Sequence, residues 1–142
     1  MKEYTSGRPV TRGVRREPSP EVDALARAVI GAAIEVHRVL GPGFMEGIYE
    51  EALCTELELR GIPFVRQPLV IVEYKSREAG ESRPDLLVGG TLVVELKAVD
   101  QLAPIHVAQL MSYLKAARCE LGLLINFNVT LLKSGVKRVV HS

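Results

Sequence analysis

Three charged residues occupy strand-like positions in residues 83–102, RPDLLVGGTLVVELKAVDQL, and they have the clearest chemical potential in the chain. Asp85 lies in the first apolar run of this segment, and Glu95 and Lys97 lie in the second. Because side chains alternate between the two faces of a strand, Glu95 and Lys97 share one face. Burying such charges costs on the order of several kcal/mol unless they pair, bind a metal or face a cleft.

The turn between the two runs decides whether Asp85 joins this face. A three-residue loop over 89–91, with a glycine at positive φ, pairs Asp85 with Glu95. A two-residue Gly89-Gly90 turn pairs Asp85 with Val94 instead and sends its side chain to the other face, unless a bulge corrects the register. A shared site therefore predicts the longer loop.

Two converging carboxylates form a hard-oxygen pocket of the kind that Mg²⁺ or Mn²⁺ accepts. Asp85 and Glu95 are thus candidate metal ligands, and the backbone carbonyl of Leu96 is a third. Lys97 is then placed to orient or deprotonate a water and to stabilise charge on a phosphate. An ion pair of Lys97 with Glu95 or Asp85 on an exposed sheet face explains the bare pattern equally well.

The surrounding sequence predicts the elements that position these residues. Capping residues, glycines and helical periodicity predict helices over 20–40, 45–60 and 104–118. β-rich runs predict strands over 64–74, interrupted at Pro68, and over 121–127 and 136–140, with a polar turn over 75–82. This order predicts an α/β fold whose mixed sheet contains an antiparallel central hairpin and a strand that joins after a helical crossover.

Helical spacing also predicts the buried faces. The inner side of the second helix is predicted to hold Met45, Ile48, Ala52, Leu53 and Leu57. The third helix is predicted to bury Val107, Leu110, Met111 and Leu114. The apolar run 121–127 is typical of a central strand covered on both faces.

Composition sets the class of the protein. The chain has 142 residues, of which 47% are hydrophobic and 25% charged. These values predict a single domain, over 19–142. Residues 1–18 mix Gly, Pro, Ser, Thr and charged residues without helical or strand periodicity, which predicts a basic, disordered tail. The five basic and two acidic residues of 1–20 give that segment a charge of +3 and leave −2 for residues 21–142. The folded part is therefore not a broadly basic nucleic-acid binder.

Two further features bound the setting. Cys54 and Cys119 have no Cys-x-x-Cys partner and no histidine cluster, which predicts buried free thiols rather than a zinc site or disulfides. No apolar run is long enough to span a membrane and no secretory signal is visible, so a cytoplasmic location is expected.

Three motifs together resemble a known nuclease group. Arg83-Pro84-Asp85 followed by Glu95-Leu96-Lys97 looks like the PD-(D/E)xK nuclease superfamily. Gln109-Leu-Met-Ser-Tyr113 is similar to the Gln-x-x-x-Tyr motif of RecB-type nucleases. Gly43-Phe-Met-Glu46-Gly-Ile-Tyr49 resembles the signature of the small bacterial GxxExxY proteins, which are placed in that superfamily.

The resemblance implies a restriction-endonuclease-like core and a nuclease that acts on DNA, or alternatively RNA, through a metal-activated water. It implies Asp85 and Glu95 as ligands of Mg²⁺ or Mn²⁺, Lys97 as the catalytic lysine, Glu46 as an additional acid, and Gln109 and Tyr113 as residues lining the site.

Other interpretations stay open at this point. A nuclease-fold module that binds nucleic acid or regulates without efficient turnover is the alternative function, since fold does not prove activity. A homodimer is a further expectation, because a small catalytic core often gains binding surface by self-association. His37 and His106 belong to no spaced ligand set and are weaker candidates.

Overall fold

The computed structural model of the protein describes residues 17–141, which form three helices of more than one turn, a short 3-10 helix and seven strands. The helices are α1 (Pro20–Leu40), α2 (Glu46–Leu59), α3 (Pro104–Ala117) and the 3-10 helix η1 (Leu132–Gly135). The strands are β1 (Phe64–Arg66), β2 (Val70–Tyr74), β3 (Arg77–Ser82), β4 (Leu86–Val88), β5 (Leu92–Lys97), β6 (Leu121–Asn126) and β7 (Val136–Val140).

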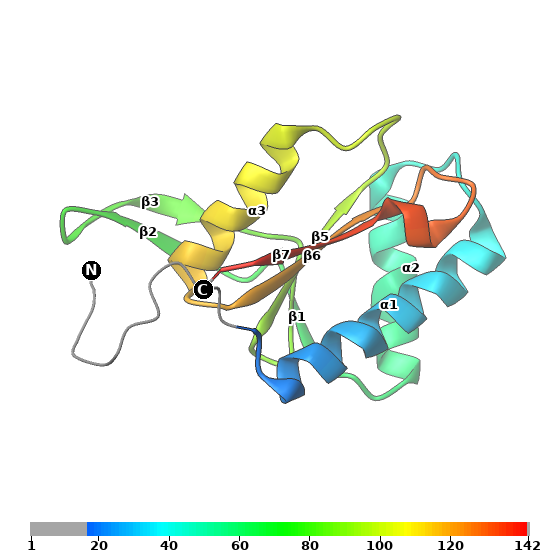
Figure 1. The fold of residues 1–142 in the computed structure, drawn as a ribbon, viewed down its shortest axis with the longest axis horizontal. Coiled ribbons are helices and arrows are strands. Elements are labelled where there is room, and N and C mark those ends of the chain that lie inside the picture. Colours follow the sequence, from blue (N-terminus) through cyan, green and yellow to red (C-terminus); the bar gives the residue numbers. More distant parts are fainter. Residues whose placement is uncertain (1–16, 142) are drawn as a thin grey trace.

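Five strands form one mixed sheet in the order β1-β4-β5-β6-β7 (Figure 1). Only β5 and β6 pair in parallel, and α3 is the crossover that connects them. Helices α1 and α2 pack on one face of this sheet and α3 packs on the other. The predicted hairpin and helical crossover are therefore confirmed.

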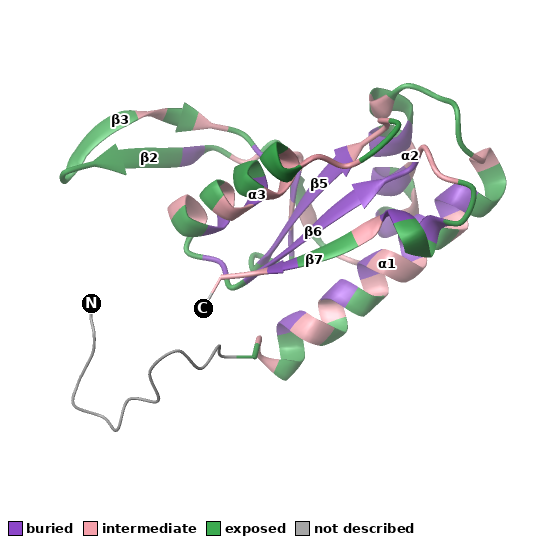
Figure 2. Ribbon diagram, turned by 45° about the horizontal axis from the view of Figure 1, so that its top comes forward, coloured by how far each residue is buried: buried purple, intermediate pink, exposed green. Residues whose placement is uncertain are grey.

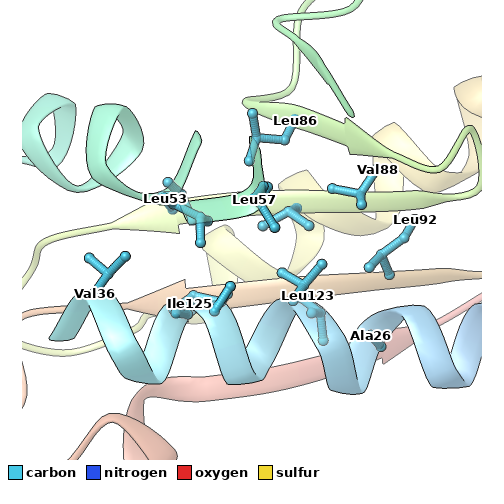
Figure 3. Packing of buried hydrophobic residues seen from close by; sticks show 14 of the residues in the cluster. Ala26, Val36, Leu53, Leu57, Leu86, Val88, Leu92, Leu123 and Ile125 are labelled. Atoms are coloured by element: carbon cyan, nitrogen blue, oxygen red, sulfur yellow. The ribbon is translucent and has the colours of Figure 1, made fainter. Parts of the chain in front are cut away.

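The larger core lies between the sheet and the pair α1 and α2 (Figure 3). There, Val36 of α1 and Leu53 and Leu57 of α2 pack against alternate residues of the strands, such as Leu123 and Ile125. A smaller cluster joins Leu110 and Leu114 to the opposite face. Every residue of β6 is buried, as predicted for a strand covered on both sides.

The hairpin turn has the three-residue loop that a shared site requires. Val88 pairs with Leu92, so residues 89–91 form the loop, and Gly89 and Gly90 both have positive φ (59° and 74°). Both angles favour glycine because a Cβ is disfavoured there. The Gly89 N–H also donates to the Pro63 carbonyl at 2.8 Å, which fixes the turn against the start of β1.

Two local predictions are wrong. Residues 77–82, predicted as part of a turn, form β3, which pairs with β2 in a separate two-stranded ribbon. This ribbon projects from the body and is largely exposed, so its sequence carries no burial pattern (Figure 2). Met45, which precedes α2, is 79% exposed, and Ile48 of α2 is 46% exposed, because the buried face of the helix instead carries Tyr49, Leu53 and Leu57.

Most of the predicted tail over 1–18 lies outside the described residues, which begin at Glu17. Cys54 and Cys119 are buried free thiols, as predicted. Within residues 17–141, no helix combines the length and apolarity needed to cross a membrane.

Gly122 of β6 allows α3 to approach the sheet closely. A Cβ at this position would lie 2.9 Å from Cδ1 of Leu110, whose side chain is fully buried. We expect Gly122→Val to lower the free energy of unfolding by roughly 1–3 kcal/mol, because overpacking forces the helix or the strand to move. Urea unfolding measures this change.

Gly47→Ala is the matched control. Gly47 is a helical residue with no atom near the position of an added Cβ, so alanine should stabilise the protein by about 0.5–1 kcal/mol. A Gly122→Val protein as stable as the wild type would contradict this packing.

Candidate active site

The centre of the site is a pair of carboxylates that brace each other across β4 and β5. The Asp85 N–H donates to Glu95 Oε1 at 2.6 Å, and the Leu96 N–H donates to Asp85 Oδ2 at 2.7 Å. Asp85 directly precedes β4, so its pairing with Glu95 continues the register of the hairpin. The two acids therefore lie side by side, and the shared-face condition set by the sequence is met.

The backbone of Leu96 faces the same gap. The Lys97 carbonyl accepts a hydrogen bond from Phe127 N–H at 2.9 Å, so Lys97 directs its backbone toward β6. Successive residues of a strand direct their N–H and C=O groups to opposite edges. The carbonyl and the N–H of Leu96 therefore both point toward Asp85, to which the N–H donates. The Leu96 side chain is buried in the larger core.

The acids are held in an environment that disfavours their charge. Burial raises the pKa of Asp85 to about 6, and the nearby charges of Glu46 and Glu50 add to this rise. Burial raises the pKa of Glu95 to about 7, and the adjacent Asp85 contributes further. The charge of Lys97 lowers both pKa values, although within residues 17–141 its ammonium forms no salt bridge with either acid.

Glu46 reaches the site from the first turn of α2, after a sharp corner between α1 and α2. The buried Tyr49 hydroxyl holds this corner, because it donates to the Gly41 carbonyl at 2.6 Å and accepts from the Phe44 N–H at 3.1 Å. The Tyr49 ring stacks on Phe127 with centroids 4.6 Å apart. Glu46 is thereby fixed where Lys97 influences its pKa, which burial raises.

The third helix brings Tyr113 and Gln109 to the same place. Burial raises the pKa of the half-buried Tyr113, and the charges of Glu95 and Asp85 raise it further. The Gln109 side chain, exposed one turn earlier, acts on Tyr113 as a hydrogen-bonding neighbour. Glu46, Lys97 and Tyr113 are thus electrostatically coupled to the carboxylate pair, whereas Gln109 is connected to it only through Tyr113.

Sequence reasoning missed two residues that border the site. Glu50 is 7% exposed, and its carboxylate accepts hydrogen bonds from Arg66 at 2.9 and 3.3 Å. Gln67, with φ 48°, donates its N–H to the Asp85 carbonyl at 2.8 Å. The spacing of Glu50 four residues after Glu46 is the one signal that places both acids on the same side of α2.

Both of the histidines considered as weaker candidates, His37 and His106, have structural partners. His37 Nε2 lies 2.7 Å from the Val129 carbonyl, and His106 Nδ1 accepts from the Ala103 N–H at 2.9 Å at the start of α3. The side-chain amide of the buried Asn126 accepts a hydrogen bond from the Val99 N–H and donates one to the Val99 carbonyl. These two bonds secure the loop that follows β5.

The donor set suits a hard cation that retains waters. Asp85 and Glu95 each use one oxygen for a backbone N–H, and no hydrogen bond within residues 17–141 engages Asp85 Oδ1 or Glu95 Oε2. In that same range, no cluster of three or more His, Cys, Asp or Glu side chains is arranged to hold a metal. Mg²⁺ commonly binds through one or two carboxylates plus waters, whereas structural zinc needs a closed set of four ligands.

Comparison with protein families matches residues 23–139 to the PD-(D/E)XK nuclease superfamily. The match runs from α1 into β7 and thus contains the candidate site and all of the sheet except the last residue of β7. Among curated proteins, none matches the chain. The family match and the sheet topology confirm the predicted fold class.

The raised pKa values predict a pH-dependent stability. A carboxyl group whose pKa rises on folding, from 3.8 for Asp85 and 4.5 for Glu95, stabilises the fold at low pH and loses that contribution as the pH rises to about 7. Each pKa unit is worth about 1.4 kcal/mol, so we expect a loss on the order of a few kcal/mol between pH 4 and pH 7 in EDTA.

Urea unfolding across this pH range, compared between the wild type and Glu95→Gln, isolates the effect. The variant should lose less stability as the pH rises, while the exposed-residue control Glu73→Gln should follow the wild type. If stability fell with rising pH equally in the wild type and in Glu95→Gln, ionisation of the carboxylate pair would not destabilise the fold.

The corner gives a second prediction. Tyr49→Phe keeps the stacked ring but removes the hydroxyl, which leaves the Gly41 carbonyl and the Phe44 N–H without this partner. We expect the free energy of unfolding to fall by roughly 1–3 kcal/mol. The exposed Tyr74→Phe is the control and should change little; equal stability of the two variants would exclude the bracing role of Tyr49.

Proposed function

Because the chain belongs to the PD-(D/E)XK nuclease superfamily, we propose that it is a metal-dependent phosphodiester hydrolase that acts on nucleic acid, with DNA favoured over RNA. The observation that carries this proposal is the braced pair of Asp85 and Glu95 beside Lys97. Two buried carboxylates with one lysine form a site that binds a cation and then a phosphate.

Asp85, Glu95 and the Leu96 carbonyl are the proposed ligands. Nucleases of this superfamily generally use divalent metal ions, and we propose Mg²⁺ or Mn²⁺ here because the donors are all oxygen. When bound, such an ion supplies Lewis acidity toward the phosphate and lowers the pKa of a water.

Lys97 acts on the reacting phosphate from its place beside the carboxylates. Its backbone is fixed to Phe127, and its ammonium lies within the influence of Asp85, Glu95 and Glu46. From there it stabilises the negative charge that grows on a phosphate oxygen and orients the attacking water.

The remaining candidates complete the walls of the site. Glu46 adds a carboxylate at the positive end of α2, where the helix dipole favours a negative charge. Gln109 and Tyr113 present an amide and a hydroxyl from α3, and both groups can donate hydrogen bonds to a phosphate. We assign them to substrate binding.

The motif containing Glu46 supports a finer assignment to the GxxExxY proteins. Gly43 has φ 109°, Glu46 begins α2, and Tyr49 braces the corner between them. Gly43 and Tyr49 thus shape the corner between α1 and α2, and this corner positions Glu46 at the start of α2. We further propose that residues 19–142 act as one nuclease-like domain.

A binding or regulatory module without efficient turnover is the second candidate. It is favoured by the lack, within residues 17–141, of any cluster of three metal-ligating side chains. Such a protein would bind nucleic acid at the same site and leave the strand intact.

Cleavage assays separate the two candidates. Plasmid, linear duplex, single-stranded DNA and RNA are incubated with Mg²⁺ or Mn²⁺, and EDTA should abolish cleavage. Glu95→Gln and Lys97→Met should each lower the rate by roughly 100-fold or more, because each removes a group that acts on the reacting phosphate or its metal.

Lys133→Met is the matched control, since Lys133 is an exposed lysine of η1, and it should cleave like the wild type. Cleavage that persists in both site variants would assign the activity to a contaminant. Binding without cleavage under every condition would favour the regulatory module.

A further inference from the structure

A groove of about 660 Å³ lies between β2 and the C-terminal half of α3. Its strand wall is formed by residues 68–73, and its helix wall includes Ser112, Lys115 and Arg118. The β2–β3 ribbon leaves the body beside α3 and forms the outer side of this groove (Figures 1 and 2). No step of the proposed hydrolysis uses this feature.

The groove adjoins the candidate active site. Pro68 lines it and directly follows Gln67, whose N–H binds the Asp85 carbonyl at 2.8 Å. Leu87 also lines it and lies two residues after Asp85 on the same side of the chain. On α3, Ser112 directly precedes Tyr113, whose pKa the charges of Glu95 and Asp85 raise. Three residues that line the groove thus lie within two positions of residues at the candidate active site.

The helix wall carries free positive charge. Lys115 and Arg118 are both exposed, and neither forms an ion pair with a residue in the range 17–141. By contrast, the five arginines that form salt bridges in this range are Arg27, Arg38, Arg60, Arg66 and Arg138. Glu73 is the one acid that lines the groove, so its basic residues outnumber its acidic ones.

The strand wall is apolar and open. Leu69 is 49% and Ile71 37% exposed. Apolar side chains on one wall and cations on the other match a ligand with flat apolar faces along one side and a row of anions along the other. A single polynucleotide strand has this character, because its bases are unstacked from a partner and its phosphates follow one edge.

We propose that this groove binds a single polynucleotide strand and leads it to or from the site of cleavage, with its phosphates on Lys115 and Arg118 and its bases against Leu69, Ile71 and Leu87. This inference rests on the proposed function, which it refines to a single-stranded substrate or single-stranded end. A duplex presents phosphates on its outside and would leave the apolar wall without a partner.

Fluorescence anisotropy in EDTA tests the proposal, because binding is then measured without cleavage. The probes are a labelled oligothymidylate and a labelled blunt hairpin duplex. In the double variant Lys115→Gln/Arg118→Gln, the affinity for the oligothymidylate should fall roughly tenfold, and the slope of log affinity against log salt should shrink by roughly 1.4, since each phosphate contact on a single strand contributes about 0.7.

The matched control is Lys133→Gln/Lys137→Gln, which removes two exposed lysines that do not line the groove and should leave the slope unchanged. The proposed binding of a single strand in the groove would be contradicted by an equal loss of affinity in both double variants or by no loss in either. Tighter binding of the duplex with the same dependence on Lys115 and Arg118 would also contradict it.

A second readout uses the absence of tryptophan from the chain. Ile71→Trp places a single indole on the strand wall, and oligothymidylate should quench its fluorescence by stacking. Val39→Trp, at an exposed position of α1, should not respond; equal quenching of both would overturn the assignment.

The two proposals can fail separately. Cleavage by the wild type together with equal binding by both double variants would overturn the groove and leave the nuclease. Groove-dependent binding without cleavage in any metal would support the groove and overturn the hydrolase.

Discussion

The site depends on two hydrogen bonds between the segments that carry Asp85 and Glu95. In one, the Asp85 N–H donates to the Glu95 carboxylate; in the other, the Leu96 N–H donates to the Asp85 carboxylate. Just before β4 begins, carboxylates replace the backbone partners of the ladder, so the strands stay together while the Leu96 carbonyl is left facing the gap. Hydrogen bonds to charged groups contribute roughly 1.5–3 kcal/mol. They hold together two acids that repel each other, and the cation that we propose for this site would relieve that repulsion.

The rest of the fold brings further groups to this pair. The Tyr49 hydroxyl fixes the corner that precedes Glu46. The close contact of Leu110 with Gly122 holds α3, which carries Tyr113, against the sheet. Arg66 connects β1 to Glu50 of α2, next to the strand end that binds the Asp85 carbonyl. The Arg66 side chain of this ion pair is 41% exposed, and the pair connects α2 to the strand that leads to Gln67.

Local patterns in the sequence predict much of this arrangement. The Gly89-Gly90-Thr91 loop determines the register that joins Asp85 to Glu95, and that register is confirmed. Periodicity fails where burial is not local: the face of α2 is set by the corner, and the exposed β3 has no apolar alternation. The Glu50–Arg66 pair was missed because it joins residues sixteen positions apart through the tertiary fold. The proximity of Glu46 to Lys97 was expected only from a family resemblance.

The most direct test of the account is calorimetric titration of Mn²⁺ into the protein near pH 7, compared with Asp85→Asn and Glu95→Gln. Because the pKa values of the two acids are raised to about 6 and about 7, Mn²⁺ binding should release protons and show a heat that depends on the ionisation enthalpy of the buffer. Both variants should lose this binding, while Glu73→Gln should retain it. Binding of Mn²⁺ by both site variants with the affinity and proton release of the wild type would contradict the account.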